Sequence, residues 1–170
     1  MGIILPYETK PEFWLRGAVD HIPALLQPIA HGLLQVRAEV NSLMVNFPEH
    51  RLWVRVAGLA APGFHLQHIP GVIDRLFTYA RGEQLSEKQM TRLKEEGQNE
   101  NMSLPELLAR LNRQVDSAMD QLRETKEGTL TNERQVGRKR VPATVIGLLV
   151  HAAEHSMRHT GQLLVTIRVV

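Results

Sequence analysis

The chain has 170 residues, with 20 basic and 18 acidic side chains and a formal net charge of +2. This balance argues against nucleic-acid binding, and no uncharged apolar run is long enough to span a membrane. The sequence contains no cysteine, which excludes disulfides, thiolate metal sites and a cysteine nucleophile, and favours a cytoplasmic location. The length suits a single domain over residues 1–170 with a sizeable core.

The first two helical stretches are predicted over about residues 22–45 and 62–80. In both, apolar side chains recur with the three- and four-residue spacing of a helix that buries one face. Pro28 lies inside the first stretch and predicts a kink, because proline lacks an N–H and crowds the preceding turn. Pro70 lies inside the second, next to His68.

A connection of about twenty residues follows the second stretch. It contains a short, mostly charged helix, with Ser86 as its N-cap and Gly97 as its terminator. We expect this extra helix to be a surface element that covers one end of the molecule.

The third helix opens with a capping box, in which Ser103 and Glu106 satisfy each other's backbone N–H groups, and its apolar stripe runs to Leu122. Residues 126–141 predict a long loop or a small hairpin. The last helix is expected from Pro142 to about Arg168. Four amphipathic helices without long strands predict an all-α four-helix bundle with one short extra helix.

Histidines interrupt the apolar face of the last helix. His151, His155 and His159 are spaced four residues apart, so they lie roughly on one face, one turn apart. On the second helix, His68 shares the face of Ile69 and should point inward. Two histidines of the last helix together with His68 would form a three-nitrogen site for a divalent metal, with positions left open for water or substrate. The alternative is a set of hydrogen-bonded or solvated histidines without a metal.

Two sequence runs carry a resemblance to a known family. The run from His151 to Gln162, HAAEHSMRHTGQ, closely resembles the last-helix signature of the DinB-like superfamily, which includes the YfiT-type metal-dependent hydrolases. The run 64–72, FHLQHIPGV, is similar to the family's second-helix ligand motif. The resemblance covers nearly the whole chain. It implies a bundle of the DinB/YfiT-like type that holds one divalent ion, zinc, nickel or manganese.

The ligands that the resemblance implies are His68, His155 and His159. Five further residues are candidates for lining the pocket or supporting these ligands: His151, His65, Gln162, Arg75 and Arg158. Arg158 stands where many relatives carry a second histidine. His151 lies one turn before His155, so direct ligation is its alternative role.

The other three candidates each have a competing interpretation. His65 could line the pocket mouth or face solvent. The amide of Gln162 could orient a ligand or form an ordinary hydrogen bond between helices. Arg75 could contact an anion, but an ion pair at the surface with a neighbour such as Glu83 is favoured.

The resemblance implies a metal-dependent hydrolase that acts on a small-molecule substrate. Because the wider family includes transferases that use low-molecular-weight thiols, thiol transfer is the alternative reaction. A non-catalytic bundle stabilised by the metal is a third hypothesis. We expect no nucleic-acid or membrane partner, and a homodimer is the commonest assembly for bundles of this size.

Overall fold

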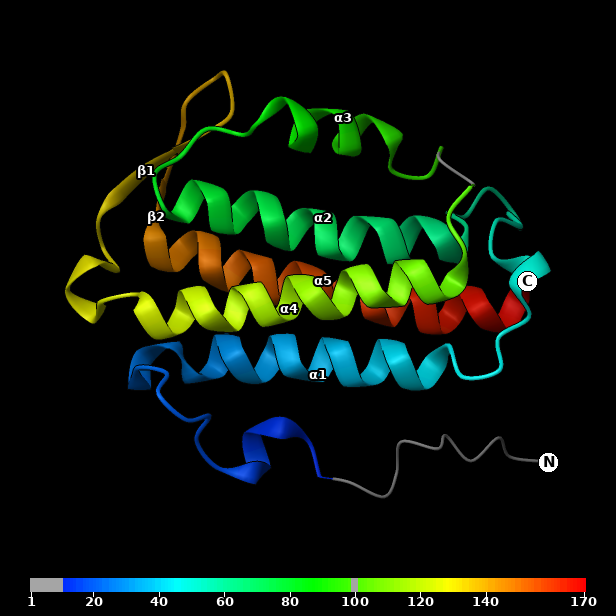
Figure 1. Ribbon diagram of the computed structural model, residues 1–170, viewed down its shortest axis with the longest axis horizontal. Coiled ribbons are helices and arrows are strands. Elements are labelled where there is room, and N and C mark those ends of the chain that lie inside the picture. Colours follow the sequence, from blue (N-terminus) through cyan, green and yellow to red (C-terminus); the bar gives the residue numbers. More distant parts are fainter. Residues whose placement is uncertain (1–10, 99–100) are drawn as a thin grey trace.

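The computed structural model describes residues 11–98 and 101–170. This part of the chain contains five α-helices and a two-stranded hairpin (Figure 1). The helices are α1 (Gln27–Leu43), α2 (Pro62–Ala80), α3 (Glu87–Glu95), α4 (Leu104–Glu124) and α5 (Val145–Val169). No described helix combines the length and apolarity needed to cross a bilayer.

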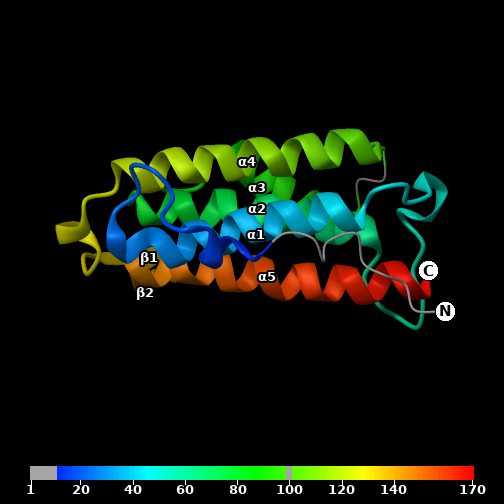
Figure 2. The same ribbon diagram turned by 90° about the horizontal axis from the view of Figure 1, so that it is seen from below.

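Helices α1, α2, α4 and α5 form the predicted four-helix bundle. Both α1 and α2 pack against α4 and α5, so α1 and α2 lie diagonally across the core (Figures 1 and 2). The core is aliphatic, and each of the four helices contributes side chains with no exposed surface, among them Leu33, Leu66, Leu111 and Leu149. The all-α prediction is therefore confirmed.

The extra helix α3 packs along the outer side of α2 (Figure 1). The predicted capping box is present at Ser103, the predicted N-cap Ser86 forms a capping box with Gln89, and Gly97 follows α3 with a φ of +77°. The expectation that α3 covers an end of the bundle is wrong, because it lies beside α2. As a result α2 is enclosed by α3, α4 and α5, and nearly all of its residues are buried.

Two predicted helix boundaries are corrected by the structure. A 3-10 turn over Ala24–Leu26 precedes α1, so Pro28 lies in the first turn of α1, where its missing N–H leaves no helical hydrogen bond unmade. Pro142 belongs to a strand, and α5 begins at Val145. The Thr144 hydroxyl caps α5 by accepting a hydrogen bond from the Gly147 N–H at 3.1 Å.

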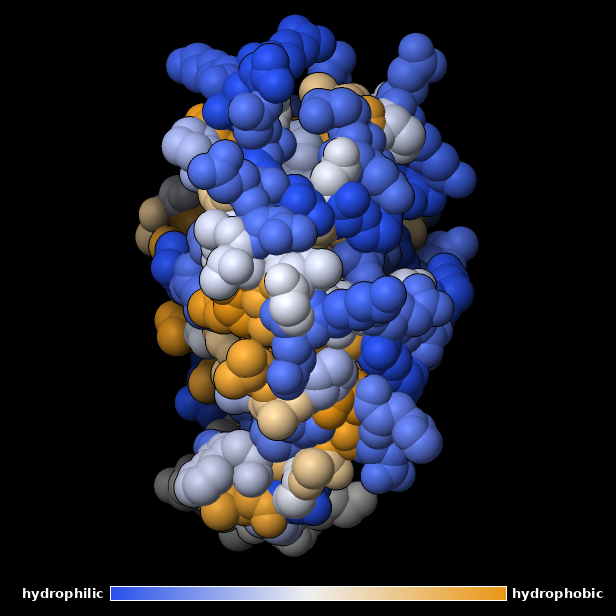
Figure 3. Space-filling model, turned by 90° about the vertical axis from the view of Figure 1, so that its left-hand side faces the viewer, coloured by the Kyte–Doolittle hydropathy of each residue, from blue (hydrophilic) through white to orange (hydrophobic). Residues whose placement is uncertain are grey.

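The hairpin alternative is confirmed for the connection between α4 and α5. Strands β1 (Glu133–Val136) and β2 (Val141–Thr144) pair antiparallel, with Glu133 opposite Thr144. Arg134 fixes the hairpin to α2, because its Nε donates to the carbonyl of Ala80 at 2.8 Å. The end of the molecule that carries the hairpin is hydrophilic in its upper part, with apolar side chains exposed lower down (Figure 3).

Candidate metal centre

Three histidines from two helices converge between α2 and α5. The Nε2 atom of His155 lies 3.1 Å from Nε2 of His68 and 3.0 Å from Nε2 of His159. All three side chains are half-buried, and their candidate ligand atoms lie within 4.8 Å of one another. The structure therefore brings together the three residues that the sequence singled out.

The spacing of these nitrogens fits one shared cation. A metal–nitrogen bond of about 2.0–2.1 Å places two nitrogens of one ion about 2.8–3.4 Å apart, for bond angles between 90° and the tetrahedral angle. The distances of 3.1 and 3.0 Å lie within this range. Imidazole donors suit zinc and nickel, whereas manganese favours oxygen ligands. The group could therefore hold a divalent metal ion.

Glu96, which directly follows α3, fixes the orientation of the His68 ring. The Nδ1 of His68 donates to a carboxylate oxygen of Glu96 at 2.7 Å. A neutral His68 with its hydrogen on Nδ1 has a lone pair on Nε2, the atom that faces His155. Carboxylates often hold metal-bound histidines in this way.

The Glu96 carboxylate is itself buried and paired with Arg75. Its side chain is only 5% exposed, and both of its oxygens accept from the Arg75 guanidinium. Burial alone would raise the pKa of Glu96, but the hydrogen bonds from His68 and Arg75 outweigh it and lower the pKa. Glu96 is therefore ionised at neutral pH.

This pair corrects the expectation for Arg75. Arg75 is buried and bonds to Glu96, whereas Glu83 pairs with Arg81 at 2.8 Å. Sequence reasoning missed Glu96 entirely, because it lies 28 residues from His68 in a charged connection. The one local signal near Glu96 was Gly97, which indicates the end of a helix.

Two glycines allow the Glu96 segment to approach α2 closely. A Cβ on Gly71 would lie 2.2 Å from a Glu96 carboxylate oxygen, so only glycine leaves room for the carboxylate there. The N–H of Gly97 donates to the side-chain oxygen of Gln67 at 2.8 Å, and its carbonyl accepts from Arg55 at 2.8 Å. These contacts hold the end of α3 against the helix that carries His68.

His65 supports the cluster from inside the bundle. It is 3% exposed, and its Nδ1 lies 3.1 Å from Nδ1 of His159. Its burial argues against a position in solvent or at the pocket mouth, whereas its contact with His159 agrees with a role in supporting the ligands. The ring of Phe64 stacks on His68 with centroids 5.1 Å apart and covers that side of the cluster.

Burial and neighbouring charges keep the imidazoles of His65, His155 and His159 neutral at pH 7. Burial, followed by repulsion from His68, lowers the pKa of both His65 and His159 to about 4. The pKa of His155 is lowered for the same two reasons. Neutral imidazole is the form that binds metals, so His155 and His159 need lose no proton at pH 7 to act as ligands.

His151 lies at the edge of the cluster and is exposed. Its Nδ1 is 2.7 Å from Glu154, which also pairs with Arg158 at 2.9 Å. His151, Glu154 and His155 form a second group whose ligand atoms lie within 4.8 Å of one another. His151 also lines an open cavity of about 650 Å³ beside the hairpin, and none of the three clustered histidines lines this cavity.

Three features of α5 provide less support for a metal site. The Nδ1 atom of His155 is buried and has no hydrogen-bond partner among the described residues, so no contact fixes its tautomer. Gln162 is exposed, and its amide forms no hydrogen bond within the described chain. Arg158 is also exposed and contacts Glu154 rather than a member of the cluster.

Comparisons with known proteins agree with this fold. A family model of the DinB superfamily matches residues 33–163. The structure is similar to the crystal structure of a structural-genomics target from Streptococcus pneumoniae, with a TM-score of 0.59 and 16% sequence identity. That similarity covers 82% of this chain and 86% of the other, and at this identity it shows the fold alone. A comparison with curated proteins finds no match.

Proposed function

This chain belongs to the DinB superfamily, and we propose that it is a metal-dependent hydrolase in which His68, His155 and His159 hold one divalent ion. The observation that carries the proposal is the approach of three Nε2 atoms from α2 and α5 around His155. Because the three proposed ligands are neutral imidazoles and none is a carboxylate, the ion would keep its full positive charge. This ligand set also leaves coordination positions open, as in catalytic rather than structural sites.

A bound divalent ion would supply Lewis acidity, which polarises a substrate carbonyl or phosphoryl group and makes a water molecule more acidic. The protein's own residues would position the site and limit the entry of water. Glu96 holds His68 in the ligand orientation, and Phe64 shields the same ring. A small-molecule substrate would enter through the cavity of about 650 Å³ lined by His151, whose ring centroid lies 5.2 Å from that of His155.

Transfer of a low-molecular-weight thiol is the second candidate function. Zinc accepts thiolate sulfur as readily as nitrogen, and the protein has no cysteine to compete for the open positions. The thiol would then be a cosubstrate rather than part of the chain. In a third case the ion only ties α2 to α5 and has no catalytic role.

Metal analysis of purified variants tests the ligand assignment. We expect one ion per chain in the unmodified protein, and its loss in H68A, H155A and H159A. His50 is exposed and distant in sequence from the cluster, so H50A is the matched control and should keep the ion. Retention in H68A together with loss in H151A would move the site to the alternative group of His151, Glu154 and His155.

Chelation then separates the three functions. A hydrolase should cleave members of an ester, amide and phosphoester panel only with metal present. A transferase should instead consume an electrophile only when metal and a thiol such as glutathione are both present. A purely structural ion would give neither activity, while its removal would sharply lower the melting temperature.

A further inference from the structure

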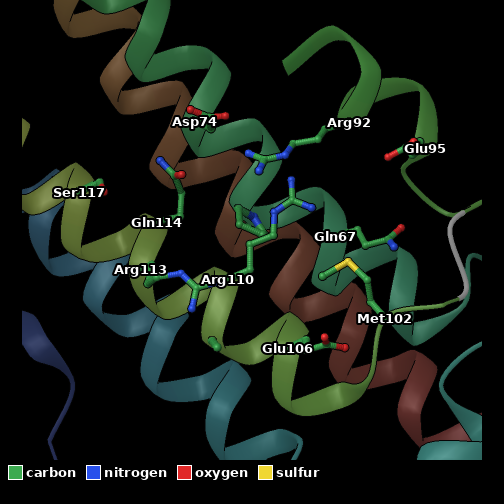
Figure 4. A pocket seen from close by; sticks show the side chains of 12 residues that line it. Gln67, Asp74, Arg92, Glu95, Met102, Glu106, Arg110, Arg113, Gln114 and Ser117 are labelled. Carbon is green, nitrogen blue, oxygen red and sulfur yellow. The ribbon is translucent and has the colours of Figure 1, made fainter. Parts of the chain in front are cut away.

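A second cavity lies between α2, α3 and α4, and none of the three clustered histidines lines it. Its volume is about 500 Å³, within the range of small-molecule sites (Figure 4). Pro70, Met102 and Ala109 supply apolar lining, and Gln114 and Ser117 supply hydrogen-bonding groups. The lining of the cavity is thus mostly polar and charged, with a smaller apolar part.

Two arginines from different helices meet in this cavity. Arg92 comes from α3 and Arg110 from α4, and both are half-buried. Their guanidinium groups point into the same space, whereas Arg113 points away from it (Figure 4). Neither Arg92 nor Arg110 has a hydrogen bond or an ion pair among the described residues. Two partly buried like charges that form no ion pair with the described residues repel each other, so this is an arrangement that a bound anion would stabilise.

Asp74, Glu95 and Glu106 also line the cavity, but none of them forms an ion pair with Arg92 or Arg110 in the described part of the chain. Asp74 accepts a hydrogen bond from Gln89 at 3.0 Å, and Glu106 is held at 2.7–2.8 Å by its capping box with Ser103. Glu95 is exposed at the rim. Burial, followed by the charge of Arg92, lowers the pKa of Arg110, and the opposing effect of Glu96 and Asp74 is too small to reverse this direction.

We propose that this cavity binds a small dianion, a phosphate monoester or a dicarboxylate, between Arg92 and Arg110. A guanidinium group offers several N–H donors in a fixed plane and pairs well with either head group. The remaining volume would hold an organic part of the ligand against Pro70 and Met102.

Calorimetric titration with inorganic phosphate and, separately, with succinate tests the proposal. The protein is first treated with a chelator, since phosphate could otherwise bind a metal ion at the histidines. We expect one of the two probes to bind, with affinity at least tenfold weaker in R92Q and R110Q. R123Q changes an exposed arginine of α4 that pairs with Asp120, and it should bind like the unmodified protein. The tighter probe identifies the head group.

A melting-temperature measurement shows whether the variants are folded. R110Q should melt no lower than the unmodified protein without anion, because it removes a partly buried charge that Arg92 repels. Only the unmodified protein should then gain stability when the anion is added. Binding of neither probe, equal affinity in R110Q, or loss of binding in H155A but not in R110Q would overturn the proposal. The last outcome would place the anion at the histidines.

Discussion

His65 and His159 face each other across the α2–α5 interface through their Nδ1 atoms, 3.1 Å apart. Since both rings are neutral at pH 7, one Nδ1 must carry a hydrogen and the other must accept it. If His159 binds a metal through Nε2, its hydrogen lies on Nδ1, and His65 must then accept that hydrogen bond. The buried histidine of α2 therefore selects the tautomer of a candidate ligand on α5.

The low pKa of His65 predicts that the metal-free protein loses stability in mild acid. The pKa is about 4 in the folded protein against 6.5 for the unperturbed group, so the unfolded chain takes up a proton first as the pH falls. The stabilisation is complete above pH 6.5 and is lost between pH 6.5 and 4. A shift of this size corresponds to on the order of 3 kcal/mol.

Denaturant unfolding in a chelating buffer at several pH values between 7 and 4 measures this loss. H65Q should show a shallower dependence of the unfolding free energy on pH, although His159 keeps part of the slope. H50A, which changes an exposed histidine, should keep the full slope. Parallel curves for H65Q and the unmodified protein would show that His65 does not carry the effect.

The buried pair of Glu96 and Arg75 predicts a double effect of E96Q. The substitution leaves the Arg75 charge buried without its partner, which costs roughly 3–5 kcal/mol of unfolding free energy. It also weakens the hold on His68, and loss of such a supporting carboxylate typically lowers metal affinity about 10–100-fold.

E95Q, at the exposed neighbouring position, is the control and should change neither property. The double variant R75M/E96Q separates the two effects, because it removes the buried charge but does not restore the carboxylate. It should regain most of the stability while metal affinity stays low. Metal affinity equal to that of the unmodified protein would show that Glu96 does not position the ligand.

Sequence periodicity predicted the helices because each buries a continuous apolar face, and it placed His68 and His155 on facing sides. Periodicity misplaced the starts of the first and last of these helices, near Pro28 and Pro142. Proline is tolerated both in a first turn, as at Pro28, and in the short strand that contains Pro142. In both cases the local sequence allows more than one structure.

Glu96 and Arg75 were missed or misplaced for a different reason. Sequence periodicity suggests one buried and one exposed face for α2, but α3 folds back and covers the second face. That contact joins residues far apart in the chain, and the charged composition of α3 predicts only exposure. The supporting groups of the candidate site therefore depend on tertiary packing that no local pattern encodes.

Gly71 provides a steric test of whether the Glu96–Arg75 pair supports the metal site. In G71A the new Cβ would lie 2.2 Å from the Glu96 carboxylate and 2.8 Å from the Arg75 guanidinium, so this pair must shift. Alanine favours a helix over glycine by about 1 kcal/mol, which partly offsets the cost. Gly161 in α5 has open space around it, and G161A should show that gain alone.

We expect G71A to be less stable than G161A by thermal unfolding and to bind metal more weakly in a chelator competition. If both variants gain stability equally and hold metal equally, then the approach of Glu96 to α2 does not matter for the site.

Ser156, directly after His155, provides a prediction about the interior of α5. Its hydroxyl is fully buried and has no hydrogen-bond partner among the described residues. An unsatisfied buried polar group costs about 1–3 kcal/mol, and alanine is the better helix former. S156A should therefore raise the unfolding free energy by roughly 1 kcal/mol or more. Ser117 is exposed on α4, so S117A should gain only a few tenths of a kcal/mol from helix propensity. Denaturant unfolding compares the two, and a loss of stability in S156A would mean that the hydroxyl makes a contact which the alanine cannot replace.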